Sequence, residues 1–105
     1  MQIDGAPGNV IGGSAAGEGN VIAANGRQGI CVTGSSATGT VVRGNHIGTN
    51  AGGTQALGNA YYGVHLDGAP NSIIGGTEPY ERNLISGNGA AGVRILGGQA
   101  TGTVI

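Results

Sequence analysis

The sequence predicts an all-β fold, a right-handed parallel β-helix of just under four coils built on three parallel sheets. Three observations support this fold class: an internal repeat of 63 residues, short segments in which apolar and polar residues alternate, and glycines that bracket those segments. Self-similarity at a fixed period is typical of a solenoid, a propeller or an array. Alternation with period two over a few residues is typical of a strand, and the chain shows no helical stripe of apolar residues.

The repeat becomes visible when the chain is aligned with itself at an offset of 63 residues. Residues 1–42 then face residues 64–105 without a gap, and 19 of the 42 pairs are identical. Chance does not plausibly produce this match. We therefore expect one structural unit over residues 1–105, made of a full repeat, 1–63, and a partial second repeat, 64–105.

Each repeat is expected to contain two coils of unequal length, because the pattern Asn-x-Ile-x-x-Asn occurs three times, at separations of 25 and 38 residues. Every coil then contributes one short strand to each of three sheets. The expected strands lie near 2–4, 30–33, 64–67 and 93–96 in the first sheet; near 9–12, 40–43, 72–75 and 103–105 in the second; and near 20–23, 45–48 and 83–86 in the third.

Inward side chains should stack on their counterparts one coil away, at a spacing of about 4.8 Å. In the first sheet these are Ile3, Ile30, Val32, Val64, Leu66, Val93 and Ile95; in the second, Ile11, Val42, Ile74 and Ile105; in the third, Ile22, Ile47 and Ile85.

Six asparagines bracket the third sheet: Asn20, Asn25, Asn45, Asn50, Asn83 and Asn88. Asparagine tolerates left-handed backbone angles at corners, and its side-chain amide can hydrogen-bond to the same amide one coil away. We therefore expect two structural ladders, one from the first and one from the second asparagine of each pattern. A binding role is the alternative.

The composition excludes several classes of partner and cofactor. Charged residues make up only 9% of the chain and the net charge is −1, so no basic surface is available for nucleic acid. No apolar run approaches the roughly 18 residues that membrane insertion requires. Cys31 is the only cysteine, which excludes an internal disulfide and a zinc site built on cysteines. We expect no metal and no cofactor.

Four motifs carry a resemblance to a known class of proteins. They occupy Gly63–Gly68, Asn71–Thr77, Arg82–Asn88 and Gly44–Thr49. The chain resembles, over essentially its whole length, the glycine- and asparagine-rich right-handed parallel β-helix repeats of large bacterial secreted and cell-surface proteins. The resemblance implies a pectate-lyase-like superhelix, an extracellular or cell-surface location and an origin as part of a longer protein. It implies no activity, because most relatives of this type have no defined function.

The carboxylates are expected to be structural. Asp4 and Asp67 are repeat equivalents with Thr33 between them, so they should lie two coils apart, about 9.6 Å. That spacing is at the far edge of the range for an inverting glycosidase pair, and we predict no catalytic residue. Glu18 and Glu81 are also repeat equivalents and should accept hydrogen bonds within their own loops. A calcium site would need roughly six to eight oxygen ligands.

One local concentration of aromatic, imidazole and carboxylate groups makes a candidate ligand site. Its residues are Tyr61, Tyr62, His65 and Asp67. Tyrosine rings can stack on sugars as well as on other apolar surfaces, and strand alternation places His65 on the outer face of the first sheet, in a polar column with Gln2, Cys31 and Arg94. We weigh a carbohydrate contact here against a solvated sheet whose two tyrosines cover a loop.

The leading functional hypothesis is a non-catalytic structural or interaction scaffold: a segment of a large secreted or surface β-helix protein, or an engineered piece of one. A carbohydrate-binding segment is the first alternative, and a polysaccharide lyase or hydrolase is the second. The outermost strands would expose unpaired backbone, and the sequence shows neither a helix nor an irregular loop to cover them. We therefore expect self-association through the open ends of the solenoid.

Overall fold

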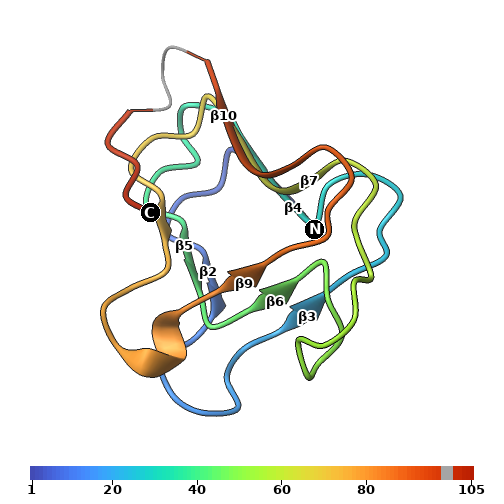
Figure 1. The fold of residues 1–105 in the computed structure, drawn as a ribbon. Helices are drawn as coiled ribbons and strands as arrows, with labels where there is room; N and C mark the ends of the chain where they lie inside the picture. The colour runs from blue at the N-terminus through green and yellow to red at the C-terminus, as the bar shows by residue number, and fades with distance from the viewer. Residues whose placement is uncertain (98–100) are drawn as a thin grey trace.

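The computed structural model describes residues 1–97 and 101–105 and shows an all-β solenoid whose strands lie in three parallel sheets (Figure 1). The first sheet contains β1 (Gln2–Asp4), β4 (Ile30–Thr33), β7 (Tyr62–Asp67) and β10 (Ala91–Leu96); the second contains β2 (Val10–Gly12), β5 (Val41–Arg43) and β8 (Ile73–Ile74); the third contains β3 (Val21–Ile22), β6 (His46–Ile47) and β9 (Leu84–Ile85). A single-turn 3₁₀ helix, η1 (Pro79–Glu81), leads into β9.

The fold class is confirmed, because the chain visits the three sheets in turn and each strand pairs in parallel with its counterpart one coil away. The strands fall at the predicted places, except that β7 and β10 each begin two residues earlier. The predicted fourth strand of the second sheet, at 103–105, pairs in parallel at the predicted place, but it does not form a full strand. Only one bridge forms there, between Ile73 and Val104.

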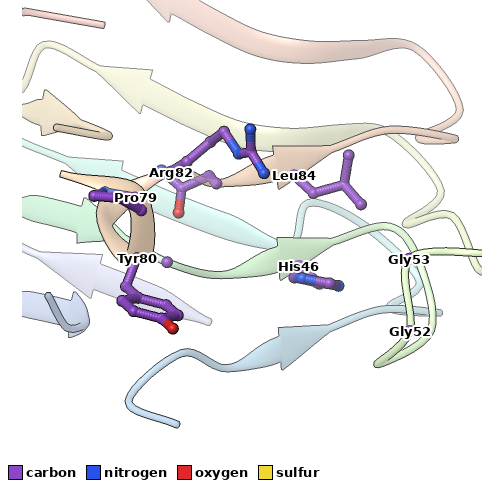
Figure 2. Close-up of a pocket in the computed structure, with 9 residues that line it drawn as sticks. His46, Gly52, Gly53, Pro79, Tyr80, Arg82 and Leu84 are labelled. Carbon is purple, nitrogen blue, oxygen red and sulfur yellow. The ribbon is translucent and has the colours of Figure 1, made fainter. Parts of the chain in front are cut away.

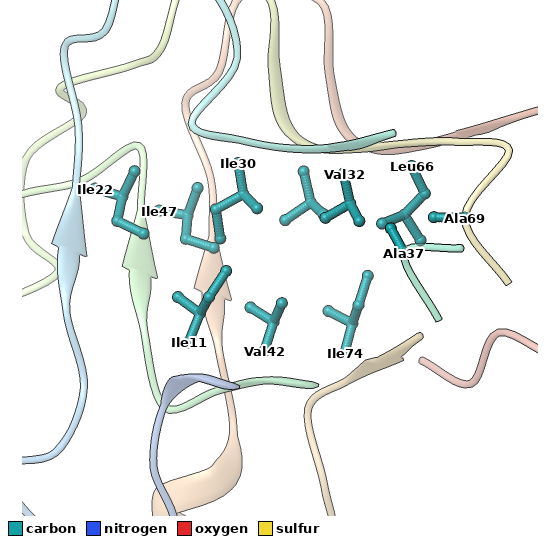
Figure 3. Packing of buried hydrophobic residues seen from close by; sticks show 11 residues of the cluster. Ile11, Ile22, Ile30, Val32, Ala37, Val42, Ile47, Leu66, Ala69 and Ile74 are labelled. Carbon is teal, nitrogen blue, oxygen red and sulfur yellow. The ribbon is translucent and has the colours of Figure 1, made fainter. Parts of the chain in front are cut away.

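The register places like residues above one another, as the repeat predicts. Ile11 lies beside Val42 and Val42 beside Ile74, and these three side chains form a row between the sheets (Figure 3). The third sheet contributes Ile22 and Ile47 to the same core. β-branched side chains suit this arrangement because they pack well on a pleated surface.

The core is confirmed in the inner coils and incomplete at the last one. Fully buried side chains include Ile30, Val32, Val64 and Leu66 of the first sheet, and Ile3, Ile85 and Val93 pack against the core from partly buried positions. Ile95 and Ile105 were predicted to be inward and buried, but they are 43% and 74% exposed. They belong to the last coil of the structure, where no further coil packs on them.

The first asparagine ladder consists of Asn20, Asn45 and Asn83. Oδ1 of Asn45 accepts from both the backbone N and the Nδ2 of Asn20, at 2.9 and 3.2 Å, and Oδ1 of Asn83 accepts in the same way from Asn45, at 3.0 and 3.2 Å. Nδ2 of Asn45 also donates to the carbonyl of Ile11 at 2.9 Å. Each rung therefore joins two coils and holds the neighbouring sheet as well.

The second ladder differs from the prediction in one residue, since its middle rung is Asn59 and not Asn50. Oδ1 of Asn59 accepts from N and Nδ2 of Asn25, at 3.1 and 2.8 Å, and Oδ1 of Asn88 accepts from N and Nδ2 of Asn59, at 3.1 and 2.9 Å. The side chain of Asn50 instead turns into its own loop, where its Oδ1 accepts from the backbone N of Thr54 at 2.9 Å.

The chain leaves the stack after Gly48 and rejoins it at Leu57. This segment, the excursion loop, explains why Asn59 and not Asn50 is the middle rung. Leu57 N donates to Gly48 O at 2.8 Å and closes the loop at its base. Asn50 lies inside the loop, so the next asparagine after the closure, Asn59, occupies the corner.

The expected left-handed conformation is absent from the six ladder asparagines and occurs instead at the residue before three of them. No ladder asparagine has a positive φ, whereas Ala24, Gly44 and Gly87 do, at 55°, 70° and 73°. Each of these residues immediately precedes a ladder asparagine.

Replacing a buried rung should destabilise the protein far more than replacing the asparagine inside the loop. Asn59→Ala removes an acceptor from two donors of Asn25 and a donor to the Ile22 carbonyl, in a side chain that is 1% exposed. We expect the free energy of unfolding to fall by about 2–4 kcal/mol in urea titrations. Asn50→Ala is the matched control and should change it by less than about 1 kcal/mol. Equal losses would show that the ladder passes through both residues or through neither.

The left-handed alanine offers a stabilising substitution. Ala24 has a φ of 55°, a region that costs an L-residue with a Cβ about 1–2 kcal/mol, and the repeat-equivalent position is Gly87 with a φ of 73°. Ala24→Gly should therefore raise the free energy of unfolding by up to about 1 kcal/mol, because the relief of strain exceeds the added freedom of the unfolded chain. A lower melting temperature for the variant would contradict this account.

Candidate functional site

The predicted ligand residues lie on and just before β7, the third strand of the first sheet. Tyr62 begins the strand and folds over its outer face, where its ring meets the ring of His65 edge-on with 5.1 Å between centroids. The guanidinium of Arg94, one coil further along, lies 5.0 Å from the centroid of the Tyr62 ring, and its Nη1 donates to the Tyr62 hydroxyl at 2.6 Å. Tyr62 is therefore already engaged by protein groups.

His65 is buried, contrary to the expectation of an exposed polar column. Its imidazole is 8% exposed, and Nδ1 accepts from Nε2 of Gln28 at 3.3 Å. Strand alternation does place it outward, in register between Cys31 and Arg94. It is buried because two side chains cover it from beside the strand. Tyr62 comes from the start of β7 and Gln28 from the preceding coil, and both pack against the imidazole.

Tyr61 and Asp67 lie apart from this cluster. Tyr61 is 49% exposed, and Asp67 is exposed at the end of β7. Of the four predicted residues, Tyr62 and His65 are therefore in contact, and Tyr61 is the tyrosine that is exposed. Asp4, Thr33 and Asp67 do lie in one column across three strands, as expected, and Thr33 Oγ1 donates to Asp4 Oδ1 at 3.3 Å.

The two repeat-equivalent glutamates hold their own loops, which confirms the structural expectation. Oε1 of Glu18 accepts from the backbone N of Ser14 and of Ala15, at 3.0 and 2.9 Å. Glu81 accepts from the backbone N of Glu78 at 3.1 Å and forms a salt bridge of 3.2 Å with Arg43. Within the described ranges, no cluster of three or more His, Cys, Asp or Glu side chains is placed to hold a metal ion.

Cys31 is a half-buried free thiol on the outer face of the first sheet. Burial raises the pKa of the Cys31 thiol, and the negative charge of Asp67 raises it further. A raised pKa leaves less thiolate at neutral pH, and the thiolate is the nucleophilic form. The local electrostatics therefore suppress nucleophilic chemistry at Cys31.

A groove of about 730 Å³ lies elsewhere, over the outer face of the third sheet (Figure 2). Its floor is formed by His46 of β6 and Leu84 of β9, which are adjacent in register. Tyr80 of η1 stands on one side and Gly52 and Gly53 of the excursion loop stand on the other. Its volume is in the range of small-molecule sites, about 300–1,000 Å³.

The strand and ladder patterns do not predict this groove, although the repeat contains a signal for it. The loop before β3 carries Ala16, Gly17 and Gly19, whereas the equivalent positions before β9 are Pro79, Tyr80 and Arg82. The loop glutamate between them is the same in both repeats. The side chains that differ are therefore additional to those that hold the loop, and they line the groove.

The reactivity of Cys31 tests the electrostatics of the outer face. Iodoacetamide should alkylate Cys31 more slowly than free cysteine at about pH 8, since a smaller fraction is thiolate. Asp67→Asn removes a charge that raises the pKa of Cys31 and should accelerate alkylation about two- to fivefold. Asp4→Asn, the repeat-equivalent control, should leave the rate nearly unchanged, and a slower reaction in the Asp67 variant would contradict the assignment.

Comparison with known proteins adds no relationship to this geometry: no family model, no curated protein and no solved structure matches the chain. Among the described residues, no helix is long and apolar enough to cross a membrane. On the evidence of its own strands and their register, the chain is a parallel β-solenoid.

Proposed function

We propose that this chain is a non-catalytic structural and interaction scaffold, a rigid segment of a large secreted or cell-surface β-helix protein. The observation that supports the proposal is that the recurring polar side chains form hydrogen bonds within the solenoid. The ladder asparagines and the two loop glutamates, which recur with the repeat, hydrogen-bond to backbone or to one another. Groups bound in this way are not free to act on a substrate.

The stacking itself supports a spacer role. The first three coils hydrogen-bond to one another in all three sheets, so bending the solenoid requires many bonds to lengthen together. The extracellular or cell-surface location in this proposal rests on the resemblance of the glycine- and asparagine-rich motifs to bacterial β-helix repeats.

The scaffold is proposed to associate with copies of itself through its outermost strands. β1 and β10 each pair on one edge only, and Ile95 and Leu96 of β10 are both 43% exposed. Unpaired edges with apolar side chains favour edge-to-edge addition. Multi-angle light scattering should give a mass that rises above the monomer with increasing concentration.

Ile95→Lys should shift that mass back toward the monomer, because a charge at an apolar stacking surface is costly to bury. Leu57→Lys is the matched control: Leu57 is 45% exposed and lies between β6 and β7, which are interior strands of their sheets, so its replacement should not alter the mass. A monomer at all concentrations would overturn the association.

Two enzyme and ligand assays separate the scaffold from its alternatives. Release of reducing ends or unsaturated products from pectin, with or without calcium, would contradict a non-catalytic role. Binding on a glycan array that is lost in Tyr61→Ala would instead support a carbohydrate-binding segment at the exposed tyrosine. The scaffold proposal expects neither signal.

A further inference from the structure

The groove over the third sheet has chemical features that the solenoid does not need. Two of its lining residues, Tyr80 and Leu84, are 59% and 38% exposed. Large apolar side chains that stay open to solvent around a concave surface mark binding sites more often than packing. Since the equivalent loop of the first repeat folds with glycine at positions 17 and 19, neither Tyr80 nor Arg82 is required for the loop itself.

The charge of the groove is positive. Arg82 is exposed on its rim and forms no salt bridge with any residue in the described part of the chain. The neighbouring carboxylate of Glu81 is directed to Arg43 and to the backbone N of Glu78. No aspartate or glutamate lines the groove itself, and Glu78 lines an adjoining hollow that Arg82 also borders.

The shape of the groove favours a flat apolar group beside that charge. His46 and Leu84 form the floor, and in Figure 2 His46 lies between Tyr80 and the two loop glycines. Gly53 has a φ of 69°, and a Cβ there would lie 2.8 Å from Cδ2 of Leu84 and 3.5 Å from Cε1 of His46. Glycine therefore lets the excursion loop close against the floor and leaves a thin backbone wall.

We propose that this groove binds a small amphiphilic carboxylate, in which a planar ring or similar apolar group adjoins a carboxyl group. The carboxylate would pair with the guanidinium of Arg82, which presents a fork of donors that matches carboxylate geometry. The ring would lie on the floor of His46 and Leu84, against the ring of Tyr80, at an offset-stacked or edge-on angle. This site is independent of the scaffold role, which stands whether or not the groove is occupied.

Nuclear magnetic resonance titration of the whole chain with benzoate tests the proposal. Saturable shifts are expected at the amides of His46, Gly53 and Leu84. Acetate has the carboxylate without the ring and benzyl alcohol has the ring without the carboxylate, so each should bind at least about tenfold more weakly than benzoate. Titration with N-acetylphenylalanine separates two sources of this chemistry, because tighter binding than benzoate identifies a peptide carboxyl terminus and weaker binding identifies a free aryl acid.

Matched variants assign the contacts. Arg82→Gln should weaken benzoate binding at least about tenfold, while Arg27→Gln, which removes an exposed arginine outside the groove, should leave it unchanged. The double variant Tyr80→Gly/Arg82→Gly installs the residues of the first repeat and should abolish saturable shifts, with the amide spectrum of the first sheet showing that the fold is intact. Absence of saturable shifts in the wild type, or equal affinity in Arg82→Gln, would overturn the proposal.

Discussion

Hydrogen bonding between asparagine side chains of successive coils is the constraint on which the rest of the solenoid depends. Each coil must bring its three short strands to the same angular positions as the coil before it, and strands of two or three residues supply few backbone bonds with which to do so. The side chain of Asn45, fully buried, bonds both to the adjacent rungs and to the carbonyl of Ile11 in the second sheet. It thereby couples the position of one sheet to that of its neighbour. The aliphatic rows of the core follow from this alignment, since Ile11, Val42 and Ile74 meet only when the corners coincide.

The strands and their register could be predicted from sequence because, in a solenoid, equivalent residues of successive coils lie directly above one another. Ile3, Val32, Leu66 and Ile95 occupy one column although their spacings along the chain differ. The same logic failed at Asn50, whose local pattern is that of the ladder residues. The pattern Asn-x-Ile-x-x-Asn indicates which side chains suit a corner of the coil, but it does not predict where the chain leaves the stack. That depends on the closure between Gly48 and Leu57.

The candidate sites were less predictable because they depend on side chains that approach from beside a strand. Alternation correctly places His65 outward, yet Tyr62 and Gln28 cover it. The groove depends on η1 and on the excursion loop, two segments that the chain separates by more than twenty residues and the third sheet brings together. The sequence signal for the groove is a difference between the repeats, Tyr80 and Arg82 in place of Gly17 and Gly19.

Because the excursion loop is closed at its base, the number of residues in a coil can change without changing the rise from one coil to the next. The chain departs from the stack after Gly48, where a Cβ would overlap the carbonyl of Ser86, and Leu57 returns it to that point. The segment between them can lengthen at the slow entropic rate of a closed loop, about 0.6 kcal/mol for each doubling, while the strands on either side keep their positions. New sequence can therefore be displayed on the flank of the solenoid without changing the rise from one coil to the next.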